Sequence, residues 1–214
     1  MTLMNPPATP PIVGDVRRRA PATARNREPI LAVLSRVLPG TGVVLEIAAG
    51  TGEHAVHFAG ALPGVNWLAS DPDAASLASI GAWRHASGLP NLLPPMMLDV
   101  ENPHWDVPPD LSAVVCINMI HIAPWSAAQA LFAGAARHLG AGGVLFLYGP
   151  YRRDGAHTAP SNAAFDGDLR ERNPRWGIRD LEAVRALGDA AGFAFVEEVA
   201  MPANNFGLVF RRAG

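Results

Sequence analysis

The chain contains no lysine, because all 17 of its lysine-plus-arginine residues are arginine. A mechanism that uses a lysine amine as a nucleophile or in a Schiff base is therefore excluded. The sequence has one cysteine, Cys116, inside the apolar run "LSAVVCINMI", so no disulfide can form within the chain. We expect Cys116 to be a small buried side chain in a protein from a reducing compartment.

Long apolar runs and an excess of positive charge are missing as well. No run approaches the roughly 18 apolar residues of a membrane span. The first 20 residues hold prolines and three arginines where a secretion signal has an apolar core. The formal net charge of −2 offers no basic surface to nucleic acid or to an anionic membrane. We therefore expect a cytoplasmic monomer or homodimer whose partner is a small molecule, with no nucleic-acid and no membrane partner.

A length of 214 residues suits one domain. Residues 1–20 lack periodicity and are predicted to form a flexible arm, followed by a single domain over 21–214. Strand-like apolar runs alternate with segments of helical spacing, which predicts an α/β fold with a mostly parallel sheet and helices on both faces. Strands are expected at 43–48, 65–70, 95–100, 111–118 and 142–150, and helices at 26–38, 73–87, 126–139 and 179–192.

Two segments depart from this alternation. Residues 150–176 are polar, contain aromatic residues and show no clear period, so we expect an irregular, lid-like insertion over a substrate. The last two strand-like runs, 193–201 and 206–212, are separated only by "PANN". Such a short connection predicts a hairpin, so that an antiparallel strand ends the sheet. Asn204 and Asn205 in its turn suit left-handed backbone, with ligand contact as the alternative.

The stretch "LEIAAGTGEHA" joins a buried strand to two glycines and the start of a helix. Gly50, Gly52 and Ala55 fit the dinucleotide-binding pattern G-x-G-x-x-G/A. The same stretch fits E-x-A-x-G-x-G, the first motif of S-adenosylmethionine-dependent methyltransferases, with Ala48 in place of a glycine. The glycines alone do not decide between these two classes of enzyme.

Acidic residues at strand ends favour the second class. Glu46, near the end of the first strand, would repel a pyrophosphate but attract the α-ammonium group of S-adenosylmethionine. Its alternative role is to cap a helix end or to pair with an arginine. Asp71 ends the second strand, where it suits the ribose hydroxyls or, as the alternative, a helix cap. Asp99 ends the third strand, where it suits the adenine amino group or, as the alternative, a turn. Three such acids and a closing hairpin together favour a methyltransferase.

Several longer phrases are similar to those of a known family. They include "RNREPIL", "LEIAAGTGEHAVHFA", "SDPD", "INMIHIAPW", "NPRWGIRDLE" and "MPANN". On them the chain resembles, from about residue 20 to residue 212, a largely uncharacterised subfamily of class I methyltransferases, often described as a domain of unknown function. The resemblance implies a Rossmann-like, seven-stranded, mostly parallel sheet with an antiparallel terminal strand, and S-adenosyl-L-methionine as the cofactor. It implies no particular methyl acceptor.

The resemblance also implies a cofactor site. The glycine motif is expected to surround the amino-acid part of the cofactor, and the next two acids its ribose and adenine. Arg25 and Asn26 are expected to meet its carboxylate, unless they only form an exposed helix start. The expected cofactor-binding residues are Arg25, Asn26, Glu46, Ala48, Gly50, Gly52, Asp71, Asp99 and Asn118.

The fourth strand delivers "INMIHIAPW" to the same edge of the sheet. Asn118 is expected to face the transferred methyl group, and His121 to act as a general base at neutral pH. The alternative for His121 is a hydrogen bond to the backbone beneath the loop. The candidates for catalysis are His121, Asn118 and Tyr148, and those for acceptor binding are Trp125, Tyr151, Asn162 and Phe165.

The remaining motifs are less specific. The lid arginines, Arg152 and Arg153, suit a compact carboxylated acceptor, although solvated arginines are the commoner explanation. His54 and His57 share a helix face without a third ligand at suitable spacing, so no metal site is expected. The sequence thus predicts a methyltransferase for a small molecule. The alternatives are a non-catalytic S-adenosylmethionine-binding regulatory protein and an NAD(P)-dependent oxidoreductase.

Overall fold

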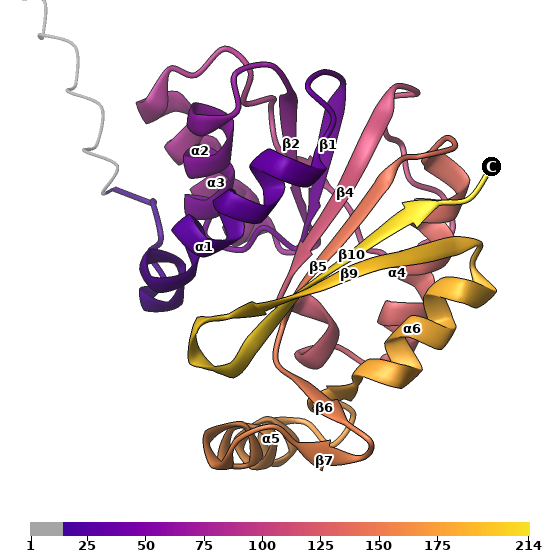
Figure 1. The fold of residues 1–214 in the computed structure, drawn as a ribbon. Coiled ribbons are helices and arrows are strands. Elements are labelled where there is room, and N and C mark those ends of the chain that lie inside the picture. The colour runs from indigo at the N-terminus through magenta and orange to yellow at the C-terminus, as the bar shows by residue number, and fades with distance from the viewer. Residues whose placement is uncertain (1–14) are drawn as a thin grey trace, which may run out of the picture.

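A computed structural model describes residues 15–214, and a seven-stranded sheet forms its centre (Figure 1). Its strands are β1 (Val43–Ile47), β2 (Asn66–Asp71), β3 (Met96–Met97), β4 (Leu111–Ile117), β5 (Val144–Gly149), β9 (Phe193–Met201) and β10 (Asn205–Arg212). They lie in the order β3-β2-β1-β4-β5-β10-β9. Neighbours from β3 to β5 are parallel, and β10 is antiparallel to both β5 and β9. The predicted sheet is confirmed.

Helices cover both faces of the sheet (Figure 1). Three of them, α1 (Pro21–Val37), α2 (Glu53–Ala61) and α3 (Ala74–Ser87), pack on one face, and α4 (Trp125–His138) and α6 (Leu181–Ala190) pack on the other. All five residues of β1 are buried, because this strand lies between the two layers. Side chains alternate along it, so Leu45 joins the α4–α6 core and Val44 joins the α1–α3 core.

Two elements differ from the sequence prediction by more than two residues at one end. Helix α1 begins at Pro21 rather than at residue 26, because a proline in the first turn needs no hydrogen-bond acceptor for its nitrogen. Asn26 therefore lies inside the helix and is buried. Strand β3 has two residues instead of the predicted 95–100, and it pairs only with the end of β2.

The segment predicted to be an irregular lid is largely regular. It contains β6 (Tyr151–Arg153), β7 (Ala156–His157) and the helix α5 (Pro160–Arg172), and β8 (Arg179–Asp180) follows it. These three short strands form a separate sheet beneath the carboxyl ends of β4 and β5 (Figure 1). The residues that α5 buries are Asn162, Asp166 and Leu169. Because only one of them is apolar, apolar spacing could not reveal this helix.

The predicted N-terminal arm falls into two parts. Residues 1–14 lie outside the described residues, whereas residues 15–20 pack against α3. The backbone N–H of Arg18 donates to Ser79 Oγ at 2.8 Å, and Trp83 Nε1 donates to the carbonyl of Arg18 at 3.0 Å. Ser79 Oγ in turn donates to the carbonyl of Thr51 at 2.7 Å. The part of the arm nearest the domain is thus attached to the glycine motif through α3.

Within residues 15–214, no helix has both the length and the apolar character that crossing a bilayer requires.

Candidate functional site

The glycine motif forms a tight turn between β1 and α2. Ala48, Gly50 and Gly52 all have positive φ angles, of 53°, 58° and 86°. A methyl group built on Gly52 would lie 2.9 Å from Ile80 Cα, whereas one built on Gly50 would meet no atom within 4 Å. Gly52 therefore allows α2 and α3 to approach each other, and Gly50 leaves open space beside the backbone.

Ala48 has the backbone conformation that favours glycine, which agrees with its place at a glycine position of the motif. An L-residue in the left-handed region is strained by roughly 1 to 2 kcal/mol. We therefore expect Ala48→Gly to raise the free energy of unfolding in urea by about 0.5 to 1 kcal/mol. Ala49→Gly, next in the chain and without a positive φ, is the control and should lower stability. Equal losses in both variants would contradict the strain at Ala48.

Asp71 supports this turn from the end of β2. Its Oδ2 accepts the backbone N–H of Gly50 at 2.9 Å, and its Oδ1 accepts the backbone N–H of Asp73 at 2.9 Å. Asp73, not Asp71, caps α3, because its side chain accepts the N–H of Ser76. Each carboxylate oxygen of Asp71 can accept a second hydrogen bond, so Asp71 can hold the turn and also bind a diol.

Glu46 is fully buried beneath α1–α3. Its Oε2 accepts a hydrogen bond from Trp67 Nε1 at 2.8 Å, and within residues 15–214 it forms no ion pair. Burial raises the pKa of Glu46 to about 8, and the nearby charge of Asp71 acts in the same direction. Neither alternative from the sequence, a helix cap or an arginine pair, describes Glu46. Glu46 lies in β1, just before the turn in the chain. Its contact with a cofactor stays a prediction.

Asp99 is exposed in the turn that follows β3. Its Oδ1 accepts the backbone N–H of Glu101 at 3.0 Å. The turn role proposed as its alternative is therefore present, and its contact with adenine stays a prediction.

A cavity of about 500 Å³ lies at the carboxyl ends of β4 and β5. That volume is typical of small-molecule sites. Its walls come from α1, the 3-10 helix η1 (Met119–His121) after β4, the end of β5, helix α5 and the turn of the β9–β10 hairpin. The lining residues are Ala22, Arg25, Asn26, Asn118, His121, Ile122, Tyr148, Pro150, Ser161, Asn162, Phe165, Pro202, Ala203 and Asn205.

Asn118 and His121 form a pair on this wall. Asn118 leaves β4 with a positive φ of 65°, and its Oδ1 lies 3.2 Å from His121 Nε2. With the amide oxygen as acceptor, Nε2 carries the hydrogen and Nδ1 carries the lone pair. His121 Nδ1 is buried and has no hydrogen-bond partner among residues 15–214. The pair therefore presents one unused proton acceptor.

The charge state of His121 follows from its surroundings. Burial lowers the pKa of His121 to about 3, and the guanidinium of Arg179 adds to the effect. The imidazole is thus neutral at pH 7. It binds a proton much less readily than an imidazole with the near-neutral pKa expected from the sequence. In the unliganded protein the side chain is a hydrogen-bond acceptor rather than a strong base.

A second polar group comes from α1. Asn26 Oδ1 lies 2.8 Å from His54 Nε2 on α2, which joins the cavity wall to the first turn after the glycine motif. Burial lowers the pKa of His54 to about 4, so His54 is neutral and donates to this oxygen. Burial raises the pKa of the Tyr148 hydroxyl, while a hydrogen bond with Asn26 acts in the opposite direction. Arg25, beside Asn26, is exposed and forms no ion pair within residues 15–214.

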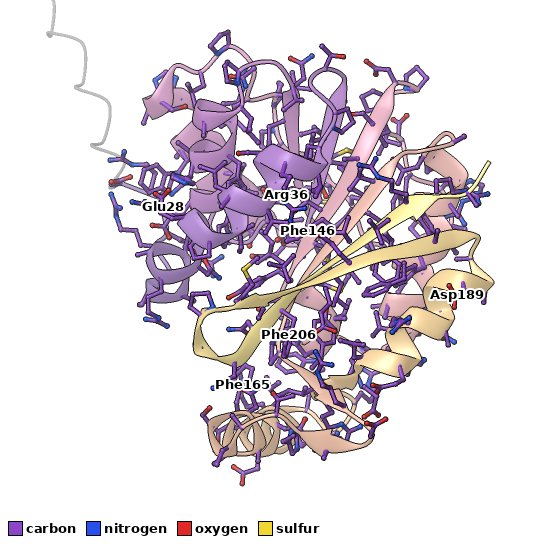
Figure 2. The ribbon with its side chains drawn as sticks, in the orientation of Figure 1. Glu28, Arg36, Phe146, Phe165, Asp189 and Phe206 are labelled. Atoms are coloured by element: carbon purple, nitrogen blue, oxygen red, sulfur yellow. The ribbon has the colours of Figure 1, made fainter. Side chains whose placement is uncertain are left out.

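Helix α5 and the hairpin turn close the lower side of the cavity. Asn162 Nδ2 donates to the carbonyl of Asn204 at 3.0 Å, which joins the two elements. Phe165 projects from α5 between that helix and the hairpin (Figure 2). Asn204 has a positive φ, as predicted for the turn, but the second left-handed residue is Ala203 rather than Asn205.

Two predicted acceptor-binding residues lie outside the cavity. Tyr151 is completely buried in the α4–α6 core, because β6 turns its ring inward. Trp125 lies on another part of the surface, where the guanidinium of Arg179 is 5.7 Å from its ring centre. In this structure neither residue can line the acceptor pocket.

The lid arginines are also engaged elsewhere. Arg152 pairs with Asp180 at 2.8 Å, and Arg153 pairs with Glu198. Their guanidinium groups hold β6 against its neighbours, and neither residue lines the cavity. Their binding of a carboxylated acceptor stays a prediction, which these ion pairs do not favour.

Sequence reasoning missed two residues that position His121. A methyl group on Gly149 would lie 2.1 Å from His121 Cε1, so only glycine leaves room for the imidazole. Arg179 donates to the carbonyls of Ile120 and Ala123 at 3.0 and 2.6 Å, which fixes the backbone on both sides of His121. The phrases "LYGP" and "GIRD" contain these residues, but no spacing rule connects them with His121.

No group of three or more potential metal ligands occurs among residues 15–214. His57 lies 3.4 Å from Glu28, and His54 is bound to Asn26, so the two histidines have separate partners.

The fold is similar to that of several solved structures. They include the S-adenosylmethionine-dependent methyltransferase SibL in its apo form (TM-score 0.73, 20% identity, 88% of this chain and 55% of that chain). A putative O-methyltransferase from Nostoc punctiforme has a TM-score of 0.75 at 17% identity over 87% of this chain and 56% of the other. Human N-acetylserotonin methyltransferase, in complex with SAM, has a TM-score of 0.74 at 13% identity over 90% of this chain and 53% of the other.

This chain spans about half the length of each of those proteins. At such identities the similarity establishes the fold, which is that of the class I methyltransferases. A family profile described as "Protein of unknown function (DUF938)" matches residues 17–212, almost the whole of the described chain. The chain therefore belongs to the DUF938 family.

Proposed function

We propose that this protein is an S-adenosylmethionine-dependent methyltransferase that acts on a small molecule. The observation that carries the proposal is the position of the cavity. It lies at the carboxyl ends of β4 and β5, in a sheet with the methyltransferase strand order, where ligands of open α/β sheets bind. The hydrogen bond between Asn26 and His54 connects it to the helix that follows the glycine motif.

The residues around the turn suit this cofactor. Gly50 leaves open space beside the backbone, and Asp71 keeps acceptor capacity for a diol. Arg25, which forms no ion pair among residues 15–214, supplies a guanidinium for a carboxylate, and Asn26 supplies an amide. When bound, S-adenosylmethionine supplies a methyl group on a sulfonium: a bond forms from the acceptor atom to that methyl as the sulfur–methyl bond breaks, and its electron pair returns to sulfur.

The chain's own residues then have to align the acceptor and remove its proton. As the bond to the methyl group forms, the proton of the acceptor hydroxyl or amine becomes strongly acidic, so that even the weakly basic Nδ1 of His121 can accept it. Asn118 fixes the tautomer that leaves the lone pair of Nδ1 free, and Gly149 and Arg179 fix the position of the ring. The apolar wall around Phe165 limits the access of water to the acceptor.

Titration calorimetry with S-adenosylmethionine, S-adenosylhomocysteine and NAD tests the cofactor. We expect both adenosyl compounds to bind and NAD not to bind. Asp71→Asn should weaken S-adenosylhomocysteine binding by about 10- to 100-fold, because a charged acceptor for the ribose hydroxyls is lost. Asp189→Asn, on the far side of the molecule in α6 (Figure 2), is the matched control and should bind as the wild type does. Binding of NAD alone would refute the proposal in favour of an oxidoreductase.

A non-catalytic, cofactor-binding regulatory protein is the second candidate. The buried Nδ1 of His121, which has no partner among residues 15–214, favours the enzyme, because turnover uses a proton acceptor whereas a binding protein needs none. Transfer of a labelled methyl group into a metabolite extract separates the two functions, since only the enzyme gives labelled products.

A further inference from the structure

The cavity wall differs from a site for a charged acceptor. Apart from His121, which is neutral, Arg25 is its only ionisable cation, and no acidic side chain lines it within residues 15–214. The arginines of β6 are paired with acids elsewhere. If Arg25 and Asn26 bind the carboxylate of the cofactor, no charged group remains for the acceptor.

Apolar groups make up much of the remaining wall. Ile122 and Phe165 are 43% and 39% exposed, and they are two of the five large apolar residues that are exposed in the described chain. The rings of Phe165 and His121 are in edge-type contact, with centroids 6.4 Å apart and an angle of 73° between their planes. Exposed apolar side chains that gather around a cavity mark a binding site more often than scattered ones do. Pro150, Pro202 and Ala203 extend the same surface.

One hydrogen-bonding atom among the cavity-lining residues is buried without a partner within residues 15–214. This atom is Nδ1 of His121, an acceptor in a residue that lines the cavity and whose ring packs against Phe165. A ligand that satisfies it must donate a hydrogen. An anionic oxygen cannot do so, and a cationic ammonium group would lie in an apolar wall without a counter-ion.

From these three observations we propose that the cavity binds a neutral, largely apolar molecule that donates a single hydroxyl group to His121 Nδ1. The inference rests on the proposed function, because it identifies the class of acceptor for that site. In the reaction, the hydroxyl proton passes to Nδ1 as the oxygen–methyl bond forms. Sulfur keeps the electrons of the broken bond, so the products are a methyl ether and S-adenosylhomocysteine.

Three matched probes test the class of ligand. They are p-cresol, which is neutral with one hydroxyl, p-hydroxybenzoate, in which a carboxylate replaces the methyl group, and p-methylanisole, in which the hydroxyl is blocked. Each is titrated into the full chain, with and without saturating S-adenosylhomocysteine. We expect p-cresol to bind at least about fivefold more tightly than either of the others, because it alone avoids a buried charge and donates to Nδ1.

Phe165→Ala should weaken p-cresol binding by roughly tenfold, since an apolar contact surface is lost. Val196→Ala removes a side chain of comparable exposure from β9, outside the cavity, and should leave binding unchanged. Tighter binding of p-hydroxybenzoate would overturn the inference and indicate that Arg25 recognises an anionic acceptor. If p-methylanisole bound as tightly as p-cresol, the proposed hydrogen bond to His121 would be refuted. If none of the three probes bound, the proposed apolar class of ligand would be refuted.

The binding of the probes and the binding of the cofactor test the two proposals separately. If p-cresol binds but neither adenosyl compound does, the ligand class stands and the methyltransferase function falls. If S-adenosylhomocysteine binds and the probes show the wrong order, the function stands and the acceptor class falls.

Discussion

His121→Ala is expected to lower the rate of methyl transfer by about 10²- to 10⁴-fold, while S-adenosylhomocysteine binds with nearly the wild-type affinity. The reason is geometric, because His121 lines the cavity and its buried Nδ1 has no hydrogen-bond partner among residues 15–214. The measurement is transfer of labelled methyl groups from S-adenosylmethionine into a metabolite extract, followed by separation of the products. Titration of S-adenosylhomocysteine into the same variant separates a catalytic loss from a loss of binding.

His104→Ala provides the control, because His104 is exposed in the loop after β3 and does not line the cavity. Its yield of labelled products should equal that of the wild type. The pH dependence is a second readout. With the pKa of His121 at about 3, protonation of the free imidazole should not reduce the rate between pH 5 and 8. Equal yields from the His121→Ala variant and the wild type would remove His121 from the mechanism.

Glu46→Gln is expected to stabilise the protein strongly at alkaline pH. The pKa of Glu46 is about 8 in the folded protein, against 4.5 for an exposed glutamate, because burial disfavours the carboxylate. Between these two values the folded state keeps a proton that the unfolded state has lost. The free energy of unfolding therefore falls as pH rises, by about 1.4 kcal/mol per pH unit from this group.

Glutamine remains neutral and its amide oxygen can still accept the Trp67 indole N–H, so the variant lacks this loss. We expect the wild type and the variant to have similar stabilities at pH 5 and to differ by roughly 3 to 5 kcal/mol at pH 9. Urea unfolding at pH 5, 7 and 9 measures the difference. Glu101→Gln, at an exposed turn residue, should show no such trend. A constant difference at all three pH values would mean that Glu46 is ionised throughout.

The strands of the sheet could be predicted because burial on both faces leaves an unmistakable apolar run, as in β1 and β4. The antiparallel strand was predictable from the short connection at 202–205. Helix α5 was not, because it buries Asn162 and Asp166 rather than an apolar stripe. The first residue of α1 is Pro21, and the spacing of apolar residues does not indicate a helix start at a proline.

At the site, sequence reasoning succeeded where one local segment supplies the chemistry. Asn118 and His121 come from one phrase, and the structure brings them together. It failed for Tyr151 and Trp125, because their orientation depends on how β6 and α4 leave the core. Gly149 and Arg179 act on His121 through tertiary contacts, which no single sequence pattern contains.

The place of β10 in the sheet has a consequence for how the chain is assembled. Within the part of the chain that the structure describes, residues 193–201 pair only with residues 205–212, and these in turn pair with β5. During synthesis, β1 to β5 can join as soon as they are made, but one edge of β5 stays uncovered until the last strand reaches it. An uncovered edge invites pairing with another chain. Nascent molecules that stall before residue 205 should thus be the form most prone to aggregate.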